Sequence, residues 1–422
     1  MKEGSKRAIQ RYLREAPSAL SALPAYDHIV VIPSYGEGDL TPTYRSLADA
    51  DGGSRLVIVV LNEPPNASEE KRRSNDETRA WAMSLGPVAT LFATASWIRR
   101  EPADLLVVER TARTTPIPAK HGVGGARTLG GDLALALAVQ DKLGDDLIRM
   151  TDGDAAVPND YFTRPLPADT VPRNIAGCVF PYAHHPAGAE HPAITCYEIA
   201  LRYYVQGLRA AGSPYAIHTV GSSMAVTPLA YAQVRGVPKR NAAEDFYLLN
   251  KVAKVGAIPS LAGAPIVLSG RASDRVPFGT GRAVADFRAQ AQCAEDYPLY
   301  DPRCFDALEE VLASLREDRA ASFDRFGTDA TTLSEIVRAL GVPEERERAR
   351  QQTKSPAAYQ RHTNTFFDAF VTRKFVHAVR DRCFPSRPLP EVLRDAAFLD
   401  APEELGAALD HLRELDGVET LR

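Results

Sequence analysis

The sequence lacks several features that would assign a protein to a class at once. Its five cysteines include no Cys-x-x-Cys pair, which disfavours both a disulfide framework and a structural zinc site. No apolar run approaches the roughly 18 residues of a membrane-spanning helix, and no apolar signal core follows the charged N-terminus. The net charge is only −4, with acids and bases interspersed, so nothing indicates a nucleic-acid partner. We therefore expect a cytoplasmic globular protein without a transmembrane span.

What the chain does have is a series of short apolar runs separated by helical patterns. Runs typical of parallel strands covered on both faces occupy residues 28–32, 55–61, 105–108 and 147–150. The alternation with helical segments predicts an α/β fold built on a mostly parallel, Rossmann-like twisted sheet flanked by helices. Helical periodicity takes over beyond about residue 290, which predicts a mainly helical C-terminal region.

These patterns divide the chain into three expected parts. They are a helical leader (1–26), an α/β domain (27–285) and a helical C-terminal region (286–422). Within the α/β domain, a nucleotide-binding half is expected at 27–154 and an acceptor half at 155–285.

The most informative stretch is Thr151-Asp152-Gly153-Asp154, which directly follows the fourth apolar run. Mg²⁺ and Mn²⁺ are commonly held by one or two carboxylates, with substrate phosphates supplying further oxygens. Asp152 and Asp154 therefore predict a divalent-metal site at the end of a strand. A solvated Asp-Gly turn is the alternative, because the motif alone is short.

A glycine-rich segment precedes this motif and runs from Lys120 past Arg127 into a helix-forming stretch. Backbone N–H groups at the start of a helix attract phosphate, and the two basic side chains would add charge. The segment therefore favours ligand binding. Glycines that serve only helix packing are the alternative.

Two further acidic residues, Glu244 and Asp245, open a later helical pattern. A carboxylate near a cleft can act as general base, whereas acids in a first helical turn can also simply favour the helix dipole. After the last apolar run comes a polar loop whose side chains could clamp an anion or complete a metal site: Arg271, Ser273, Asp274 and Arg275.

In this order the motifs resemble the family 2 glycosyltransferases and their GT-A relatives over residues 27–280. The segments that carry the resemblance are Ile32-Pro33-Ser34-Tyr35-Gly36-Glu37, Gly124-Gly125-Ala126-Arg127-Thr128-Leu129-Gly130, Thr151-Asp152-Gly153-Asp154, Gly221-Ser222-Ser223-Met224-Ala225 and Glu244-Asp245. The resemblance implies a GT-A fold and transfer of a sugar from a UDP- or GDP-sugar donor to a hydroxyl-bearing acceptor, with Mn²⁺ or Mg²⁺ as cofactor.

The resemblance also implies roles for individual residues. Asp154 and Asp152 would hold the metal, with Asp274 as a candidate further ligand, and Asp245 would be the catalytic base beside Glu244. The donor-binding residues would be Pro33, Tyr35, Glu37, Asn62, Lys120, Arg127 and Asp152. Arg271, Ser273 and Arg275 would form an acceptor or phosphate loop.

Two other functions fit parts of the pattern. A sugar nucleotidyltransferase also combines a parallel sheet, a glycine-rich loop and a metal-binding aspartate, but it usually has basic residues in the loop after the first strand. A non-catalytic GT-A-like module that binds sugar is the second alternative. The sequence leaves open the sugar, the acceptor, inversion or retention, and the oligomeric state, a homo-oligomer included.

Overall fold

The computed structural model describes residues 9–10, 12–13, 17–166, 174–185, 191–271, 279–289 and 294–419. The chain forms two compact units. The sheet unit comprises Met1–His185, Thr219–Arg282 and Gly417–Arg422, and the helical unit comprises Pro186–His218 and Ala283–Asp416. The described residues 191–218 belong to the helical unit and pack with its C-terminal helices.

In the described part of the sheet unit, eight strands form one sheet in the order β3-β4-β5-β2-β1-β6-β9-β7. They are β1 (His28–Ser34), β2 (Arg55–Asn62), β3 (Val88–Phe92), β4 (Ala95–Ile98), β5 (Ala103–Arg110), β6 (Ile148–Met150), β7 (Gly177–Val179) and β9 (Met224–Val226). The four central strands β5, β2, β1 and β6 are parallel. The predicted α/β fold with a mostly parallel sheet, followed by a helical C-terminal region, is confirmed.

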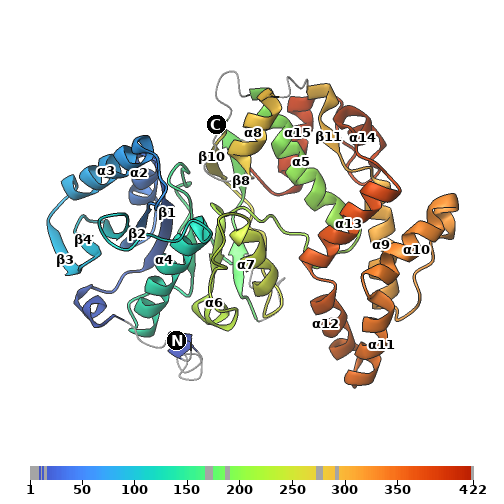
Figure 1. Ribbon diagram of the computed structural model, residues 1–422, viewed down its shortest axis with the longest axis horizontal. Coiled ribbons are helices and arrows are strands. Elements are labelled where there is room, and N and C mark those ends of the chain that lie inside the picture. The colour runs from blue at the N-terminus through green and yellow to red at the C-terminus, as the bar shows by residue number, and fades with distance from the viewer. Residues whose placement is uncertain are drawn as a thin grey trace. The chain divides into compact units, whose positions relative to one another are not determined.

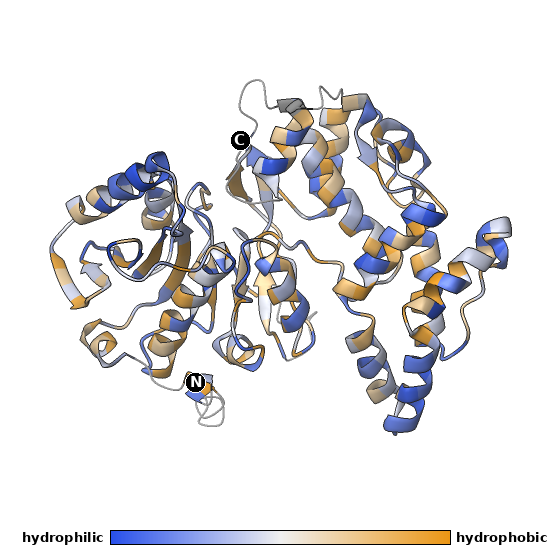
Figure 2. Ribbon diagram, viewed as in Figure 1, coloured by the Kyte–Doolittle hydropathy of each residue, from blue (hydrophilic) through white to orange (hydrophobic). Residues whose placement is uncertain are grey.

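The central strands form where the sequence is continuously apolar. Every residue of β1 and β2 is buried, and Ile29 lies in register with Leu56 on one side and with Ile148 on the other. The sheet unit also contains the helical elements η1 (Ser18–Ala22), α2 (Thr41–Asp49), α3 (Glu69–Ser84), α4 (Gly122–Val139), α6 (Pro228–Gln233) and α7 (Glu244–Val252). Helix α4 packs on β1 and β2, and the first turns of α3 are hydrophilic (Figures 1 and 2).

Strands β3 and β4 were not predicted. They add an antiparallel hairpin to the edge of the sheet at β5. Val88, at the start of β3, is 47% exposed, and the outer strand is exposed over its first three residues. The strand is apolar in sequence, Val-Ala-Thr-Leu-Phe, but it is short and largely exposed, so it lacks the long buried run of the central strands.

A second, two-stranded parallel sheet pairs β8 (Tyr182–His185) with β10 (Ile266–Ser269). A bridge from Ala156 to Val267 connects this small sheet to the segment that follows the Asp152-Gly153-Asp154 motif. The residue that follows β10 by two positions, Arg271, is thereby held near the carboxyl end of β6.

The helical unit contains most of the chain after residue 282. Its elements are α5 (His191–Ala210), η3 (Ala294–Asp296), β11 (Pro298–Leu299), α9 (Arg303–Arg316), η4 (Asp324–Asp329), α10 (Ala330–Ala339), α11 (Val342–Gln352), α12 (Pro356–Phe366), α13 (Ala369–Arg382), β12 (Arg387–Pro388), α14 (Leu389–Asp395) and α15 (Leu405–Leu415). Helix α8 (Thr280–Ala289) contains the transition from one unit to the other. Among the described residues, no helix has both the length and the apolar character needed to cross a membrane.

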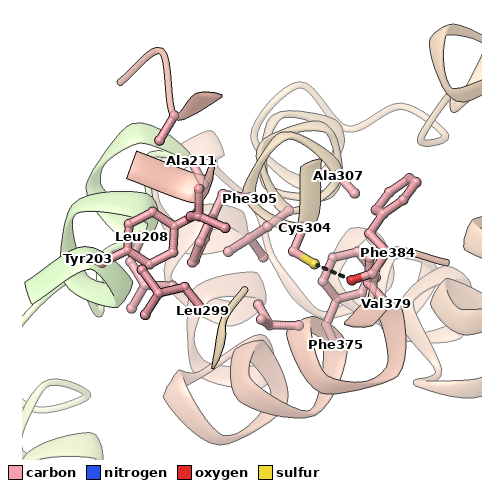
Figure 3. Close-up of a cluster of buried hydrophobic side chains, with 14 of the residues drawn as sticks. Tyr203, Leu208, Ala211, Leu299, Cys304, Phe305, Ala307, Phe375, Val379 and Phe384 are labelled. Atoms are coloured by element: carbon pink, nitrogen blue, oxygen red, sulfur yellow. Dashed lines mark hydrogen bonds between the residues drawn. The ribbon is translucent and has the colours of Figure 1, made fainter. Parts of the chain in front are cut away.

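The core of the helical unit explains why α5 belongs to it. Tyr203 and Leu208 of α5 pack with Phe305 of α9 and Phe375 of α13 in one buried cluster (Figure 3). In the same cluster the Cys304 thiol donates to the Phe384 carbonyl at 3.7 Å, as the dashed line in Figure 3 marks.

A buried ionic network adds to this packing. Arg202 of α5 donates to Asp416 at 2.6 Å and pairs with Glu198 at 2.8 Å, and His218 contacts Asp416 at 2.8 Å. Breaking one member of such a network leaves a buried charge unpaired, which is costly. Residues 198–218 are therefore fixed to the end of α15 by charge as well as by apolar contact.

Candidate functional site

Polar side chains lie at the carboxyl ends of three neighbouring central strands. Ser34 ends β1, Asn62 ends β2 and Thr151 directly follows β6. Their side-chain oxygens, Ser34 Oγ, Asn62 Oδ1 and Thr151 Oγ1, are buried and have no hydrogen-bond partner among the described residues. Because an unsatisfied buried polar atom is costly, this edge has hydrogen-bonding capacity left for a ligand. It is also the edge at which open α/β sheets bind ligands.

Asn75 of α3 holds together the two loops that follow β1 and β2. Its Oδ1 accepts from the Gly36 amide at 2.9 Å, and its Nδ2 donates to the Asn62 carbonyl at 3.1 Å. Asn75 is fully buried, so its amide is committed to these contacts. Of the predicted donor-binding residues, Pro33 lies buried within β1, whereas Tyr35 follows the strand in the loop that Asn75 anchors.

Arg127 is the centre of a buried charged cluster. It lies on α4, and its side chain is only 2% exposed. Its Nε donates to Glu244 Oε1 at 2.9 Å and its Nη1 to the Gly221 carbonyl at 2.8 Å. Its Nη2 donates to Asp152 Oδ1 at 2.5 Å, and the Ser222 hydroxyl donates to the other oxygen of Asp152. The structure thus brings together four separate segments that the sequence analysis singled out.

The pKa values of Glu244 and Asp245 are both raised in this cluster. Burial, with Asp245 beside it, raises the pKa of Glu244 from its ordinary 4.5 to about 7. Burial also raises the pKa of Asp245, although its Oδ1 accepts from the Phe246 amide at 2.7 Å. Burial acts to lower the pKa of Arg127, but Asp152 and Glu244 raise it above its ordinary value, so the guanidinium stays charged. A carboxylate pair with raised pKa values is suited to proton transfer near neutral pH.

Two backbone features make room for this pair. A Cβ on Gly221 would lie 2.6 Å from Arg127 Nη2 and 3.3 Å from Asp245 Oδ2, so a side chain there would displace the guanidinium. Ala243, directly before Glu244, has φ 57°, the left-handed region that residues other than glycine seldom adopt. Such strain persists only where surrounding contacts over-determine it, and it recurs at functional sites.

Asp154 belongs to a second ionic group. The Arg271 Nη2 donates to Asp154 Oδ2 at 3.0 Å and also donates to Glu37 Oε2. Arg271 Nε is 3.2 Å from the same Asp154 oxygen. The side chain of Glu37 is 8% exposed, that of Asp154 30% and that of Arg271 42%. The Gly153 carbonyl accepts from Thr43 Oγ1 at 2.8 Å, which ties the motif to α2.

The side chains around Asp154 can be compared with the ligands that a divalent metal needs. Among the described residues, no group of three or more His, Cys, Asp or Glu side chains is arranged to hold one. Mg²⁺ and Mn²⁺ sites in nucleotide enzymes nevertheless need only one or two carboxylates, because the phosphates supply the rest. One oxygen of Glu37 and one of Asp154 both contact the Nη2 of Arg271, so the two carboxylates meet at a single positive charge. The residues therefore fit a cation that is shared with a diphosphate.

The glycines of the glycine-rich segment pack closely against their surroundings in the sheet unit. The Gly124 amide donates to the Arg240 carbonyl at 2.8 Å, and a Cβ on Gly124 would lie 2.3 Å from the Pro238 carbonyl oxygen. A Cβ on Gly130 would lie 2.4 Å from Val31 Cγ1. These glycines let α4 approach a neighbouring loop and the sheet closely, which is the packing alternative.

Other predicted site residues are placed as follows. Lys120 lies exposed in the turn before α4, outside the contacts described above. Ser273, Asp274 and Arg275 lie outside the described residues, so the structure does not locate them. Sequence reasoning missed the contact of Ser222 with Asp152, the bridging role of Asn75 and the pairing of Arg271 with Glu37 and Asp154. The only sequence signal for the last is a basic residue in the polar loop that follows the last apolar run.

The fold and the site together define an α/β protein with an anionic site at the carboxyl edge of a mostly parallel sheet. No family model matches the sequence, and no curated protein sequence matches it.

Solved structures do match, at low similarity. The mannosyltransferase PcManGT from Pyrobaculum calidifontis, in complex with GDP-Man and Mn²⁺, is 16% identical, with a TM-score of 0.37; the match covers 90% of this chain and 96% of that one. S. aureus TarS 1-349 is 12% identical, with a TM-score of 0.35 and coverage of 84% and 91%. Glucosyl-3-phosphoglycerate synthase from Mycobacterium tuberculosis, in complex with Mn²⁺, UDP and glucosyl-3-phosphoglycerate, is 13% identical, with a TM-score of 0.31 and coverage of 68% and 88%.

Proposed function

We propose that the protein is a nucleotide-sugar-dependent glycosyltransferase that uses a divalent cation and inverts the configuration of the transferred sugar. The observation that carries the proposal is that Arg127 holds Glu244, the neighbour of Asp245, beside Asp152 at the carboxyl edge of the sheet. Such an edge binds nucleotides in many α/β proteins, and a base with a raised pKa is what activation of a hydroxyl requires.

In this account Asp245 is the base. It removes the proton from the acceptor hydroxyl as that oxygen bonds to the anomeric carbon, and the bond from the anomeric carbon to the donor's phosphate oxygen breaks. The electron pair of that bond leaves with the nucleoside diphosphate. Attack from the face opposite the leaving group inverts the anomeric centre. Glu244 and Asp152 do not transfer protons in this account; through Arg127 they orient α4 and α7 around the base.

The donor's nucleoside and diphosphate would occupy neighbouring parts of the same edge. The unsatisfied oxygens of Ser34, Asn62 and Thr151 support placing the nucleoside at the ends of β1, β2 and β6. Asn62 Oδ1 is an acceptor for a ring N–H, which uracil and guanine both offer. Either a UDP-sugar or a GDP-sugar therefore suits this position.

Asp154 and Glu37 would hold the cation. A divalent ion there supplies the positive charge that stabilises a departing diphosphate. Mn²⁺ and Mg²⁺ both accept carboxylate and phosphate oxygens, and either is compatible with this pair.

A thermal-shift screen of UDP, GDP, ADP and CDP, each with and without Mn²⁺ or Mg²⁺, tests the proposal. A ligand that binds only the folded protein raises its apparent stability. We expect one of these diphosphates to raise the midpoint, and to raise it more with metal. If no diphosphate shifts the midpoint under any of these conditions, the proposal is wrong.

A further inference from the structure

Arg271 occupies the place at which a cation shared by Glu37 and Asp154 would sit. Its Nη2 donates to both carboxylates at once, and its Nε reinforces the contact with Asp154. Both carboxylates therefore face the positive charge of one guanidinium.

Asp152 is engaged in the neighbouring cluster. Its two oxygens accept from Arg127 and from the Ser222 hydroxyl. Arg127 is buried and makes its own contacts with Glu244 and Gly221, so releasing Asp152 would leave a buried guanidinium partly unpaired. Glu37 and Asp154 therefore share one guanidinium, whereas Asp152 contacts a different one.

We infer that Arg271 is a built-in competitor of the divalent cation: the metal binds Glu37 and Asp154 only when the Arg271 guanidinium moves off them. This inference rests on the proposed function for the presence of a cation. The guanidinium and a divalent ion exclude each other because they need the same oxygens and carry charge of the same sign.

The competition has a consequence for the order of events. The Arg271 side chain is 42% exposed, so it has room to leave, and a diphosphate would give its guanidinium a new bidentate partner. Metal and nucleotide then bind cooperatively. The diphosphate draws Arg271 off Glu37 and Asp154, which frees these carboxylates for the metal, and a bound metal in turn frees Arg271 for the diphosphate. By linkage, the nucleotide strengthens metal binding by the same factor as the metal strengthens nucleotide binding. The free protein binds metal weakly, which keeps the cation site coupled to the donor.

The test is a titration of the whole protein with Mn²⁺ in the absence of nucleotide. Electron paramagnetic resonance of the free ion gives the amount bound. We expect Arg271→Met to bind Mn²⁺ roughly tenfold more tightly than wild type, within the range usual for coupled sites. Arg271→Lys keeps the positive charge and should stay close to wild type. Adding Glu37→Gln to Arg271→Met should abolish the gain. Arg382→Met, which removes an exposed arginine paired with Glu335 in the helical unit, is the control for overall charge.

Equal Mn²⁺ affinity of wild type and Arg271→Met, or weaker binding by the variant, overturns the inference. If Arg271→Met does not fold, Arg271→Gln is measured in its place with the same expected gain. Because no nucleotide is present, this outcome is independent of the nucleotide screen. A protein that binds no diphosphate but still shows the gain in Arg271→Met would contradict the proposed function and not the competition.

Discussion

The Arg127 guanidinium and the Asp152 carboxylate form an ion pair with an Nη2 to Oδ1 distance of 2.5 Å. The two aspartates of the Asp152-Gly153-Asp154 motif pair with different arginines. The first aspartate fixes a buried arginine that also holds Glu244, and the second is paired with the more exposed Arg271. Two acids one residue apart therefore have different neighbours and, in our account, different tasks.

Replacing Arg127 with Met should lower the free energy of unfolding. The change leaves Asp152 and Glu244 without their buried cation, and breaking such a pair typically costs about 3–5 kcal/mol. Urea unfolding at pH 8 measures this loss. At pH 5 the loss should be smaller, because Glu244 can then be neutral.

Arg127→Lys distinguishes charge from geometry. Lysine keeps the charge but lacks the planar fork that reaches Glu244, Gly221 and Asp152 together. We expect it to be less stable than wild type as well. A Lys variant as stable as wild type would contradict the cluster's dependence on guanidinium geometry.

Asp245→Asn should retain donor binding while losing sugar transfer. The amide cannot take a proton from the acceptor, and loss of a general base typically lowers the rate by about 10²–10⁴-fold. Turnover is measured as release of nucleoside diphosphate, and binding by calorimetry. Asp381→Asn is the matched control, because the Asp381 side chain is 60% exposed and lies in the helical unit. Full turnover by Asp245→Asn would remove this residue as the base.

Glu244 should make stability depend on pH. Since its pKa is raised from 4.5 to about 7 on folding, the folded protein binds the proton more tightly than the unfolded chain. The stability that Glu244 contributes is therefore fully present below pH 4.5 and is lost as the pH rises through about 7.

The comparison with Glu244→Gln isolates this effect, because glutamine does not titrate. As the pH rises from 5 to 8, we expect the unfolding free energy of the variant to increase relative to that of wild type by roughly 1–3 kcal/mol. Unfolding free energies of both proteins across this range provide the measurement. A difference between them that stays constant with pH would contradict the raised pKa.

Gly130→Ala tests the packing role of the glycine-rich helix. The new Cβ would meet Val31 Cγ1 at 2.4 Å, and overpacking a core typically costs about 1–3 kcal/mol. Val31→Ala removes the atom that clashes, so the double variant should be less destabilised than the sum of the single variants. A double-mutant cycle of unfolding free energies measures this coupling. Strict additivity would mean that Gly130 is not required for the approach of α4 to β1.

The sequence predicted the centre of the sheet well and its edge poorly. The buried strands β1, β2 and β5 carry continuous apolar runs, and two-sided burial is the physical cause of such runs. Strand β3 is apolar but has only five residues and is largely exposed, so it does not show the longer, fully buried run of the central strands. Helix α5 has clear helical spacing, but its membership of the helical unit depends on contacts with residues more than 100 positions away.

The same contrast applies to the site. The motifs around Asp152 and Asp245 follow strand ends or open a helix, so local pattern was enough to find them. The burial of Arg127, however, results from three contacts made by segments distant in sequence, and only the fold reveals them. Likewise, nothing in the local sequence says that Arg271 reaches Glu37, which lies 234 positions away.

Calorimetric titration of wild type and Asp154→Asn with the preferred nucleoside diphosphate, with and without Mn²⁺, tests the central claim most directly. The claim is that Asp154 couples a divalent cation to the donor's diphosphate at the carboxyl edge of the sheet. The account predicts that Mn²⁺ tightens diphosphate binding by wild type and has little effect on Asp154→Asn. Diphosphate binding that Mn²⁺ tightens equally in both proteins would contradict it.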